Sequence, residues 1–365
     1  MTQKIHWDDD DLADLLNGAT FYGSGGGGPK KMGEIVNALI KKKGFPKMVP
    51  PSAMADDDWA VIAAGVGSPE ASGDFKPEVV AHAVDVMETA MSADMGKDIK
   101  LSHMMAVEIG AGNTYMPIAS AITRGCAVID GAAASRAIPK ITMSTLAAAG
   151  IDVGYMTLAN DDAQMTLKAG AASTLSAPMR SLLSNPPFDQ VAGLAIWPIQ
   201  GKVVKELAIA GTITKAREFG AAVRKADNKV QAAIDASGGV LLGQGVATTN
   251  TQIGGAFDHT VVTVTSKEGT ELQASAQVLN IIALNENLFA STAADGPVAA
   301  APDLISYIHP KTGVVVSNVE LKDQDEIAVI GSPAGPKMLQ GTILAQFKEV
   351  LQDPVGYYGK TPLLT

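Results

Sequence analysis

Two carboxylates close predicted buried strands in the first half of the sequence. Glu108 follows the apolar stretch LSHMMAV, and Asp130 follows CAVI. Small residues after each carboxylate leave room for a substrate, and Asn113 and Arg136 lie a few positions further on. A carboxylate pair beside a guanidinium can activate water and polarise a carbonyl or amidine carbon. We therefore predict that Glu108, Asp130 and Arg136 are catalytic. We also predict that the side-chain amide of Asn113 binds substrate.

These residues also have a structural interpretation. Asp130 could instead cap the helix that follows it, with Arg136 paired to it. Ligands in open α/β sheets bind outside the carboxyl ends of the strands, which favours the functional interpretation. We expect Glu108 and Asp130 to share one pocket with the glycine-rich run at residues 23–28, in a cleft between two domains.

The stretch FYGSGGGGPKKMGE places five glycines in the six positions 23–28. Part of the run fits the dinucleotide spacing G-x-G-x-x-G, but it follows a predicted helix rather than a strand. Pro29 stands where a phosphate-binding P-loop needs lysine, so we expect no nucleotide cofactor. Free N–H groups where a helix begins still bind anions. We predict that Gly25, Gly26 and Gly27 bind a substrate carboxylate or carbonyl, with a tight structural turn as the alternative.

A metal site has few candidate ligands in this sequence. The five histidines include no H-x-H or H-x-x-x-H pair, so a zinc site would have to be assembled from distant positions. His259 follows a glycine turn and is the better ligand candidate, with Asp130 as a second. His103 lies inside a predicted strand and is interpreted as a core residue, and the single cysteine, Cys126, as a small hydrophobe. Zinc is the metal that we expect if one is bound.

Composition excludes several classes of protein. The chain has 365 residues, 47% hydrophobic and 18% charged, and a formal net charge of −10, which argues against nucleic acid or an anionic membrane as the main partner. One cysteine excludes an internal disulfide. No apolar run reaches transmembrane length, and the opening MTQKIHWDDDD turns acidic at once, unlike a signal peptide. We expect a cytoplasmic homo-oligomer.

Hydrophobic patterning divides the chain in two. Strand and helix patterns alternate over residues 1–168, which predicts a three-layer α/β domain with a largely parallel sheet. Residues 169–365 carry many short β-rich segments, such as HTVVTVTS and DEIAVIGSP, separated by turn residues. We predict there a mainly β, barrel-like domain with one long helix over residues 214–234.

Several motifs resemble a known family. GSGGGGP, VEIGAGNTYMPIASAITRGCAVIDGAAASRAIPKITMST, GTITKAREFGAAVRKA, LNENLFA and AAPDLISYIHPKTG occur in this order. Together they resemble the two-domain family known as domain of unknown function 917. Its characterised members are S-methyl thiohydantoin desulfurases, and relatives accompany hydantoinase/oxoprolinase genes. The resemblance runs over residues 10–362 and implies an α/β domain followed by a barrel-type β domain.

The resemblance implies a hydrolase that acts on a hydantoin-like or thiohydantoin-like ring, a small cyclic amide or thioamide. Such enzymes displace sulfur from the carbon between the two ring nitrogens. The chain departs from the family pattern D-A-D-G-M-G-R-A-F-P-E at two acidic positions, which are Ala132 and Lys140 here. These departures leave open a second class of function, a non-catalytic ligand-binding or accessory subunit of a hydantoinase/oxoprolinase-type system.

Overall fold

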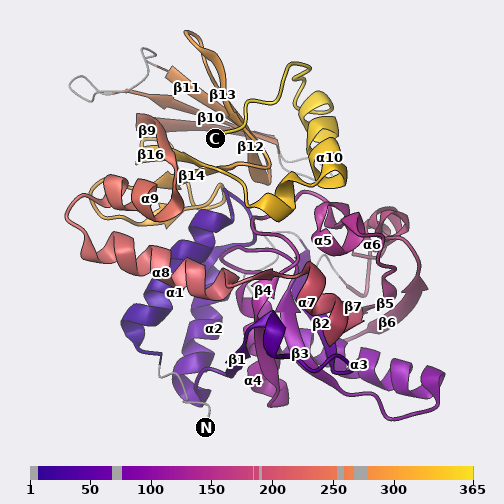
Figure 1. Cartoon of the computed structure of the whole chain (residues 1–365). Coiled ribbons are helices and arrows are strands. Elements are labelled where there is room, and N and C mark those ends of the chain that lie inside the picture. The colour runs from indigo at the N-terminus through magenta and orange to yellow at the C-terminus, as the bar shows by residue number, and fades with distance from the viewer. Residues whose placement is uncertain are drawn as a thin grey trace.

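The computed structural model of the chain describes residues 7–67, 76–183, 185–188, 191–252, 259–266 and 278–364. Two sheets divide these residues between them, and the second lies above the first in the view of Figure 1. In the part of the chain that the structure describes, no helix has the length and apolar character needed to cross a membrane.

The first sheet contains eight strands. They are β1 (Lys47–Val49), β2 (Trp59–Gly67), β3 (Leu101–Ala106), β4 (Ala127–Ala132), β5 (Gly154–Ala159), β6 (Gln164–Ala169), β7 (Val191–Gln200) and β8 (Ile209–Ala210). The order is β1-β4-β3-β2-β7-β5-β6, with β8 paired to β4. β1, β4, β3 and β2 run parallel, whereas β7, β5 and β6 add antiparallel pairs. The predicted α/β fold with a largely parallel sheet is confirmed, and β7 enters the sheet from beyond residue 168.

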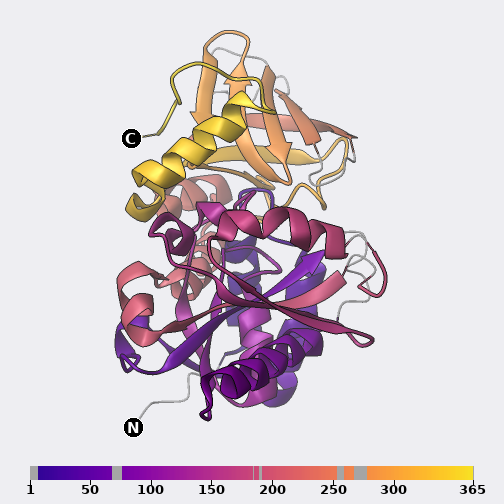
Figure 2. The ribbon, with the colours of Figure 1, turned by 90° about the vertical axis from the view of Figure 1, so that its right-hand side faces the viewer.

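Helices cover both faces of the first sheet. The α-helices among the described residues are α1 (Asp9–Tyr22), α2 (Lys30–Lys43), α3 (Glu78–Met95), α4 (Tyr115–Arg124), α5 (Thr145–Ala148), α6 (Ser176–Leu183), α7 (Gly201–Leu207), α8 (Thr212–Lys225), α9 (Lys229–Ser237) and α10 (Gly341–Gln352). Helices α1, α2, α3, α4 and α8 pack on one face of the sheet through one apolar core. Helices α5, α6 and α7 pack on the other face through a second core. Strand residues alternate between these cores, as Val61 and Ile62 do, because successive side chains point to opposite faces. Figure 2 shows the resulting three layers.

The second sheet is antiparallel and curled into a half-barrel, which confirms the barrel-like prediction. Its strands are β9 (Val240–Gln252), β10 (His259–Thr265), β11 (Val278–Leu284), β12 (Glu286–Thr292), β13 (Gly296–Ala300), β14 (Leu304–Ile308), β15 (Val315–Val316) and β16 (Glu326–Ser332). Their order is β13-β12-β11-β10-β9-β16-β14-β15. The curl brings β12 and β14 into contact, although they are not neighbours in this order. α10 packs against the sheet through Ile343 and Phe347.

The single long helix predicted over residues 214–234 is two helices. The backbone becomes extended at Ala226, which ends α8. The side chain of Asn228 then accepts a hydrogen bond from the Gln231 N–H at 3.0 Å and caps α9. Asparagine favours such a cap because its side-chain oxygen satisfies a free N–H group where a helix begins. The helical periodicity continued across this break, so patterning alone did not reveal it.

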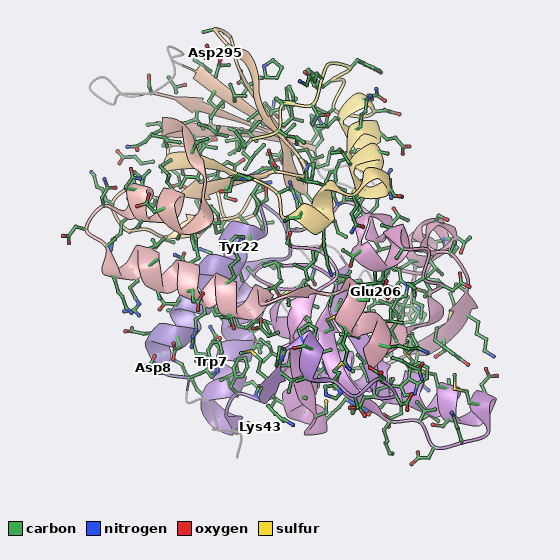
Figure 3. All side chains as sticks on the ribbon, viewed as in Figure 1. Trp7, Asp8, Tyr22, Lys43, Glu206 and Asp295 are labelled. Atoms are coloured by element: carbon green, nitrogen blue, oxygen red, sulfur yellow. The ribbon has the colours of Figure 1, made fainter. Side chains whose placement is uncertain are left out.

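α1 and α8 lie in backbone contact. A Cβ atom at Gly18 would lie 1.8 Å from the Ala216 carbonyl oxygen, so only glycine allows this approach. The rings of Phe21 and Phe219 stack with centroids 4.1 Å apart. Tyr22, labelled in Figure 3, ends α1 in the middle of the molecule. Because the glycine run follows Tyr22 directly, the contact with α8 fixes where that run begins.

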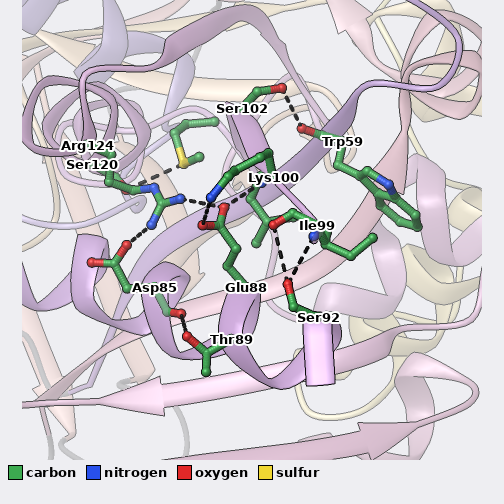
Figure 4. Close-up of polar contacts among 12 residues, drawn as sticks. Trp59, Asp85, Glu88, Thr89, Ser92, Ile99, Lys100, Ser102, Ser120 and Arg124 are labelled. Carbon is green, nitrogen blue, oxygen red and sulfur yellow. Dashed lines mark hydrogen bonds and ion pairs between the residues drawn. The ribbon is translucent and has the colours of Figure 1, made fainter. Parts of the chain in front are cut away.

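Polar contacts hold the N-terminal end of β3, at Leu101. The Glu88 carboxylate in α3 accepts hydrogen bonds from the Leu101 N–H at 2.6 Å and from the Arg124 guanidinium at 2.8 Å. Arg124 also pairs with Asp85, so α3, α4 and β3 meet at one cluster (Figure 4). The far end of β3 leads to Glu108 and is thereby held in position.

Asp130 in β4 caps α8. Its Oδ1 accepts from the Ile213 N–H at 2.8 Å and the Thr214 N–H at 3.2 Å, and its Oδ2 from the Thr214 hydroxyl at 2.5 Å. Gly211 precedes α8 and offers no capping side chain of its own. A carboxylate facing free N–H groups at a helix start is stabilising. Asp130 therefore caps a helix, but that helix is α8 rather than the next one along the chain, and Arg136 donates to backbone carbonyl groups instead of pairing with Asp130.

Replacing Asp130 by alanine should lower the free energy of unfolding by about 1–3 kcal/mol, because buried N–H groups lose a charged acceptor. Thermal unfolding followed by circular dichroism measures the loss. Thr214→Val is the matched control, because it removes only the hydroxyl bond and should cost less. A wild-type melting temperature combined with low turnover per folded molecule would instead support the catalytic role.

Candidate active site

Glu108 is buried just beyond the end of β3. Its Oε1 accepts a hydrogen bond from the Asn113 side-chain amide at 2.8 Å, and its Oε2 accepts one from the Ile138 N–H at 2.8 Å. The structure thus brings together two of the residues singled out in the sequence, Glu108 and Asn113. Asn113 lies in the loop between β3 and α4, which a bond from the Gly110 N–H to the Thr114 hydroxyl helps to shape.

Hydrogen bonds to its carbonyl groups hold the glycine run between the two halves of the protein. On one side, the Ser24 carbonyl accepts from the Asn287 N–H at 2.8 Å, and the Gly25 carbonyl from the Asn318 N–H at 2.9 Å. On the other side, the Gly27 carbonyl accepts from the Asn113 N–H at 3.0 Å. The run therefore links the loop that follows β3 to the second sheet.

Close approach explains the glycines of this run. A Cβ atom at Gly26 would lie 2.6 Å from Glu286 Oε1, and one at Gly27 would lie 2.5 Å from Gly110 Cα. Gly25 and Gly27 also have φ of +88° and +78°, a backbone conformation that favours glycine. These contacts are those of the tight structural turn. Ligand binding by Gly25, Gly26 and Gly27 stays a prediction.

Glu286 is the site residue that sequence reasoning did not single out. It begins β12, is 5% exposed, and its Oε2 has no hydrogen-bond partner among the described residues. The signal in the sequence was weak: a single acid in LNENLFA, which was used only as a family motif. A lone acidic residue inside a buried strand is unusual enough to mark a site.

Arg136 is fully buried and bonded to backbone carbonyl groups. It donates to the carbonyl oxygens of Ala137 at 2.9 Å, Asn287 at 2.8 Å and Asp303 at 2.6 Å. Its guanidinium carbon lies 5.5 Å from the centre of the Phe347 ring. It therefore reaches the site as a positive charge, with its N–H groups engaged by the protein.

The three ionisable groups influence one another. Burial raises the pKa of Glu108 to about 7, against the hydrogen bonds from Ile138 and Asn113 and the charge of Arg136, which lower it. Burial, and then the charge of Glu108, raise the pKa of Glu286 to about 8. Burial lowers the pKa of Arg136 to about 10, so it stays charged at neutral pH. The site thus holds one fixed cation and two carboxyl groups that lose their protons near neutral pH, Glu108 before Glu286.

The other predicted residues, Asp130 and His259, make their contacts with other parts of the structure. Both oxygens of Asp130 face α8. His259 is half-buried at the start of β10 opposite Leu284, and the glycine turn before it, residues 254–255, lies outside the described residues. Within the described ranges, no group of three or more His, Cys, Asp or Glu side chains is arranged to hold a metal ion. Zinc binding by Asp130 and His259 stays a prediction.

Comparisons with known proteins agree with the motifs. The profile described as "S-Me-THD-like, N-terminal domain" matches residues 10–168, and that described as "S-Me-THD-like, C-terminal domain" matches residues 172–346. No curated protein matches the chain significantly. A crystal structure of a protein from Chromobacterium violaceum is 26% identical and superposes with a TM-score of 0.83 over 97% of this chain and 98% of that one.

The two profiles together span most of the sequence, and the fold agrees with the solved structure along the whole chain. Residues in both matched regions build the cluster of Glu108, Arg136 and Glu286. The chain therefore belongs to the S-Me-THD-like family, the family of domain of unknown function 917 that its motifs resemble.

Proposed function

We propose that this protein is a hydrolase that acts on a hydantoin-like or thiohydantoin-like five-membered ring. It breaks the bond between a ring carbon and its sulfur substituent, as a desulfurase does. The observation that carries the proposal is the buried pair of carboxyl groups, Glu108 and Glu286, beside the glycine run. Both have raised pKa values. Such a pair can supply an acid and a base near neutral pH. Membership of the family supports the hydantoin-related substrate.

The reaction needs one base and one acid. The ring carbon between the two nitrogens is amidine-like, and the oxygen of a water molecule forms a bond to it while the C–S bond breaks. Of the two water protons, one ends on a ring nitrogen and the other on the departing thiol. Glu108 suits the base, because hydrogen bonds from Asn113 and Ile138 favour its ionised form. The second carboxyl group supplies the proton.

Arg136 contributes through its charge. Its N–H groups already donate to backbone carbonyl oxygens, so it acts without a hydrogen bond to the substrate. A buried cation stabilises one nearby carboxylate and so favours the state in which one carboxyl group is ionised and the other is protonated. This is the state that the proposed reaction requires.

A second candidate is a non-catalytic ligand-binding or accessory subunit. Two observations favour it. Both oxygens of Glu108 already accept hydrogen bonds from the protein. The chain also lacks the two acids of the family pattern: Ala132, which is fully buried, and Lys140, which is exposed, stand in their places. Turnover of a small panel of hydantoins and thiohydantoins by the purified protein separates the two candidates, because a binding subunit would convert none of them.

Glu108→Gln should lower turnover of an S-methylated thiohydantoin by about 100-fold or more, because the amide cannot accept a proton from water. Release of thiol measures the rate, and circular dichroism reports the folded fraction. Glu34→Gln removes a glutamate from an exposed ion pair with Lys31 and is the control. Equal turnover by both variants would remove Glu108 from the chemistry.

Gly26→Ala should lower kcat/KM by roughly tenfold or more, because the new methyl group displaces the Glu286 carboxyl group. Gly341→Ala is the control, since a Cβ atom there meets nothing within 4 Å. Both variants should fold. If Gly26→Ala turns over substrate at the wild-type rate, the position of Glu286 does not matter to catalysis.

The carboxyl pair should also reduce stability as pH rises. An unperturbed glutamate has a pKa of 4.5, whereas the folded protein holds these protons to about 7 and about 8. Between these limits the folded state binds more protons than the unfolded state, so this contribution to the free energy of unfolding falls as pH increases. Urea unfolding at several pH values should show Glu286→Gln gaining stability relative to the wild type from about pH 5 to about pH 8. A constant difference would mean that Glu286 is ionised throughout.

A further inference from the structure

One oxygen at the junction of the two sheets lacks a partner. Oε2 of Glu286 is buried and makes no hydrogen bond to the described residues. Its neighbours are satisfied: both oxygens of Glu108 accept hydrogen bonds, and Arg136 donates to several carbonyl groups. An unpaired buried polar group costs about 1–3 kcal/mol, so one among satisfied neighbours points to a missing partner.

The residues around Glu286 hold it firmly. The next residue, Asn287, is fully buried; its side-chain amide donates to the Ile305 carbonyl at 2.8 Å and accepts from the Tyr307 hydroxyl at 2.9 Å. Its backbone N–H donates to the Ser24 carbonyl. These bonds fix the backbone at the start of β12, from which the Glu286 side chain extends.

The carboxyl group that carries the unpaired oxygen lies against the glycine run, with its other oxygen, Oε1, nearest to Gly26. A Cβ atom at Gly26 would lie 2.6 Å from Glu286 Oε1 and 2.9 Å from its carboxyl carbon. The charged groups that act on Glu286 from the surrounding elements are Glu108 and Arg136. Arg136 also acts on Asp303, so one cation serves three carboxyl groups, and burial favours the protonated form of Glu286. A protonated Glu286 is then a hydrogen-bond donor without an acceptor.

A second unpaired oxygen lies on the adjoining side of the run. The Asn318 side-chain nitrogen donates to the Asn285 carbonyl at 2.8 Å and to Asn287 Oδ1 at 2.9 Å, which fixes the orientation of the amide. Its Oδ1 is buried, has no donor among the described residues, and can only accept. A cyclic amide carries both N–H and C=O groups on one ring, so it can satisfy an acceptor as well as a donor.

We infer that neutral Glu286 is the ligand-binding carboxyl group of this site, and that it donates a hydrogen bond to a carbonyl oxygen of an uncharged cyclic amide lying against Gly26. This inference rests on the proposed function and narrows its substrate class to neutral rings. An anionic ligand would have to approach the Glu108 carboxylate, which repels it.

Calorimetric titration with 3-methylhydantoin tests the inference, because this probe lacks the acidic N–H between the two carbonyl groups and stays neutral. Wild-type affinity should fall about tenfold between about pH 6 and about pH 9, since the carboxylate cannot donate. Glu286→Gln keeps a donor at every pH and should bind with affinity independent of pH. Glu286→Leu has similar size without a donor and should bind at least about tenfold more weakly at the lower pH.

The outcomes separate this inference from the proposed hydrolase. The ligand-binding role is overturned if the affinity of Glu286→Gln still depends on pH, or if Glu286→Leu binds with wild-type affinity. Either result holds even if thiohydantoins are turned over. A wild-type protein that turns over thiohydantoins but does not bind millimolar 3-methylhydantoin also overturns it. Binding that follows the expected pattern without any turnover supports the inference and refutes the hydrolase. Circular dichroism confirms that each variant is folded.

Discussion

The junction depends on one buried positive charge. Removing a guanidinium from water is costly unless each N–H group finds an acceptor. Arg136 meets this requirement with carbonyl groups, one beside it in sequence and others at Asn287 in β12 and at Pro302 and Asp303 in the turn between β13 and β14. The segment after β4 supplies the cation, and β12 and the turn between β13 and β14 supply most of its acceptors, so burial of this charge depends on the two halves of the chain meeting here.

The same charge determines what the two glutamates can do. Without a cation, two carboxyl groups at this depth would both be neutral, because burial disfavours the ionised form. Arg136 acts on Glu108, Glu286 and Asp303, so its one charge cannot compensate all of them in the ionised form. Glu108 has the hydrogen-bond donors that an ionised group needs, and Glu286 has none on Oε2. The asymmetry between acid and base therefore follows from the local contacts of two identical residue types.

The sequence predicted the fold class and part of the site. Strand and helix periodicity indicated the α/β half and the curled β half, and strand-end reasoning found Glu108. Asp130 shows the same signature at the end of a buried strand, yet α8 lies in front of it and occupies its oxygens. That helix comes much later in the chain, so no local pattern could separate the two carboxylates. Glu286 was missed for the same reason, because its significance arises from its closeness to Gly26 and from the charges of Glu108 and Arg136, which only the folded chain brings near it.

The glycine run shows how one motif can answer to two constraints. Gly25 and Gly27 adopt positive φ, so their backbone conformation alone favours glycine. Gly26 does not lie in that region. What excludes a side chain there is the Glu286 carboxyl group, 2.6 Å from the position of a Cβ atom. The flanking glycines therefore shape the turn, whereas Gly26 keeps a carboxyl group in place and belongs to the site.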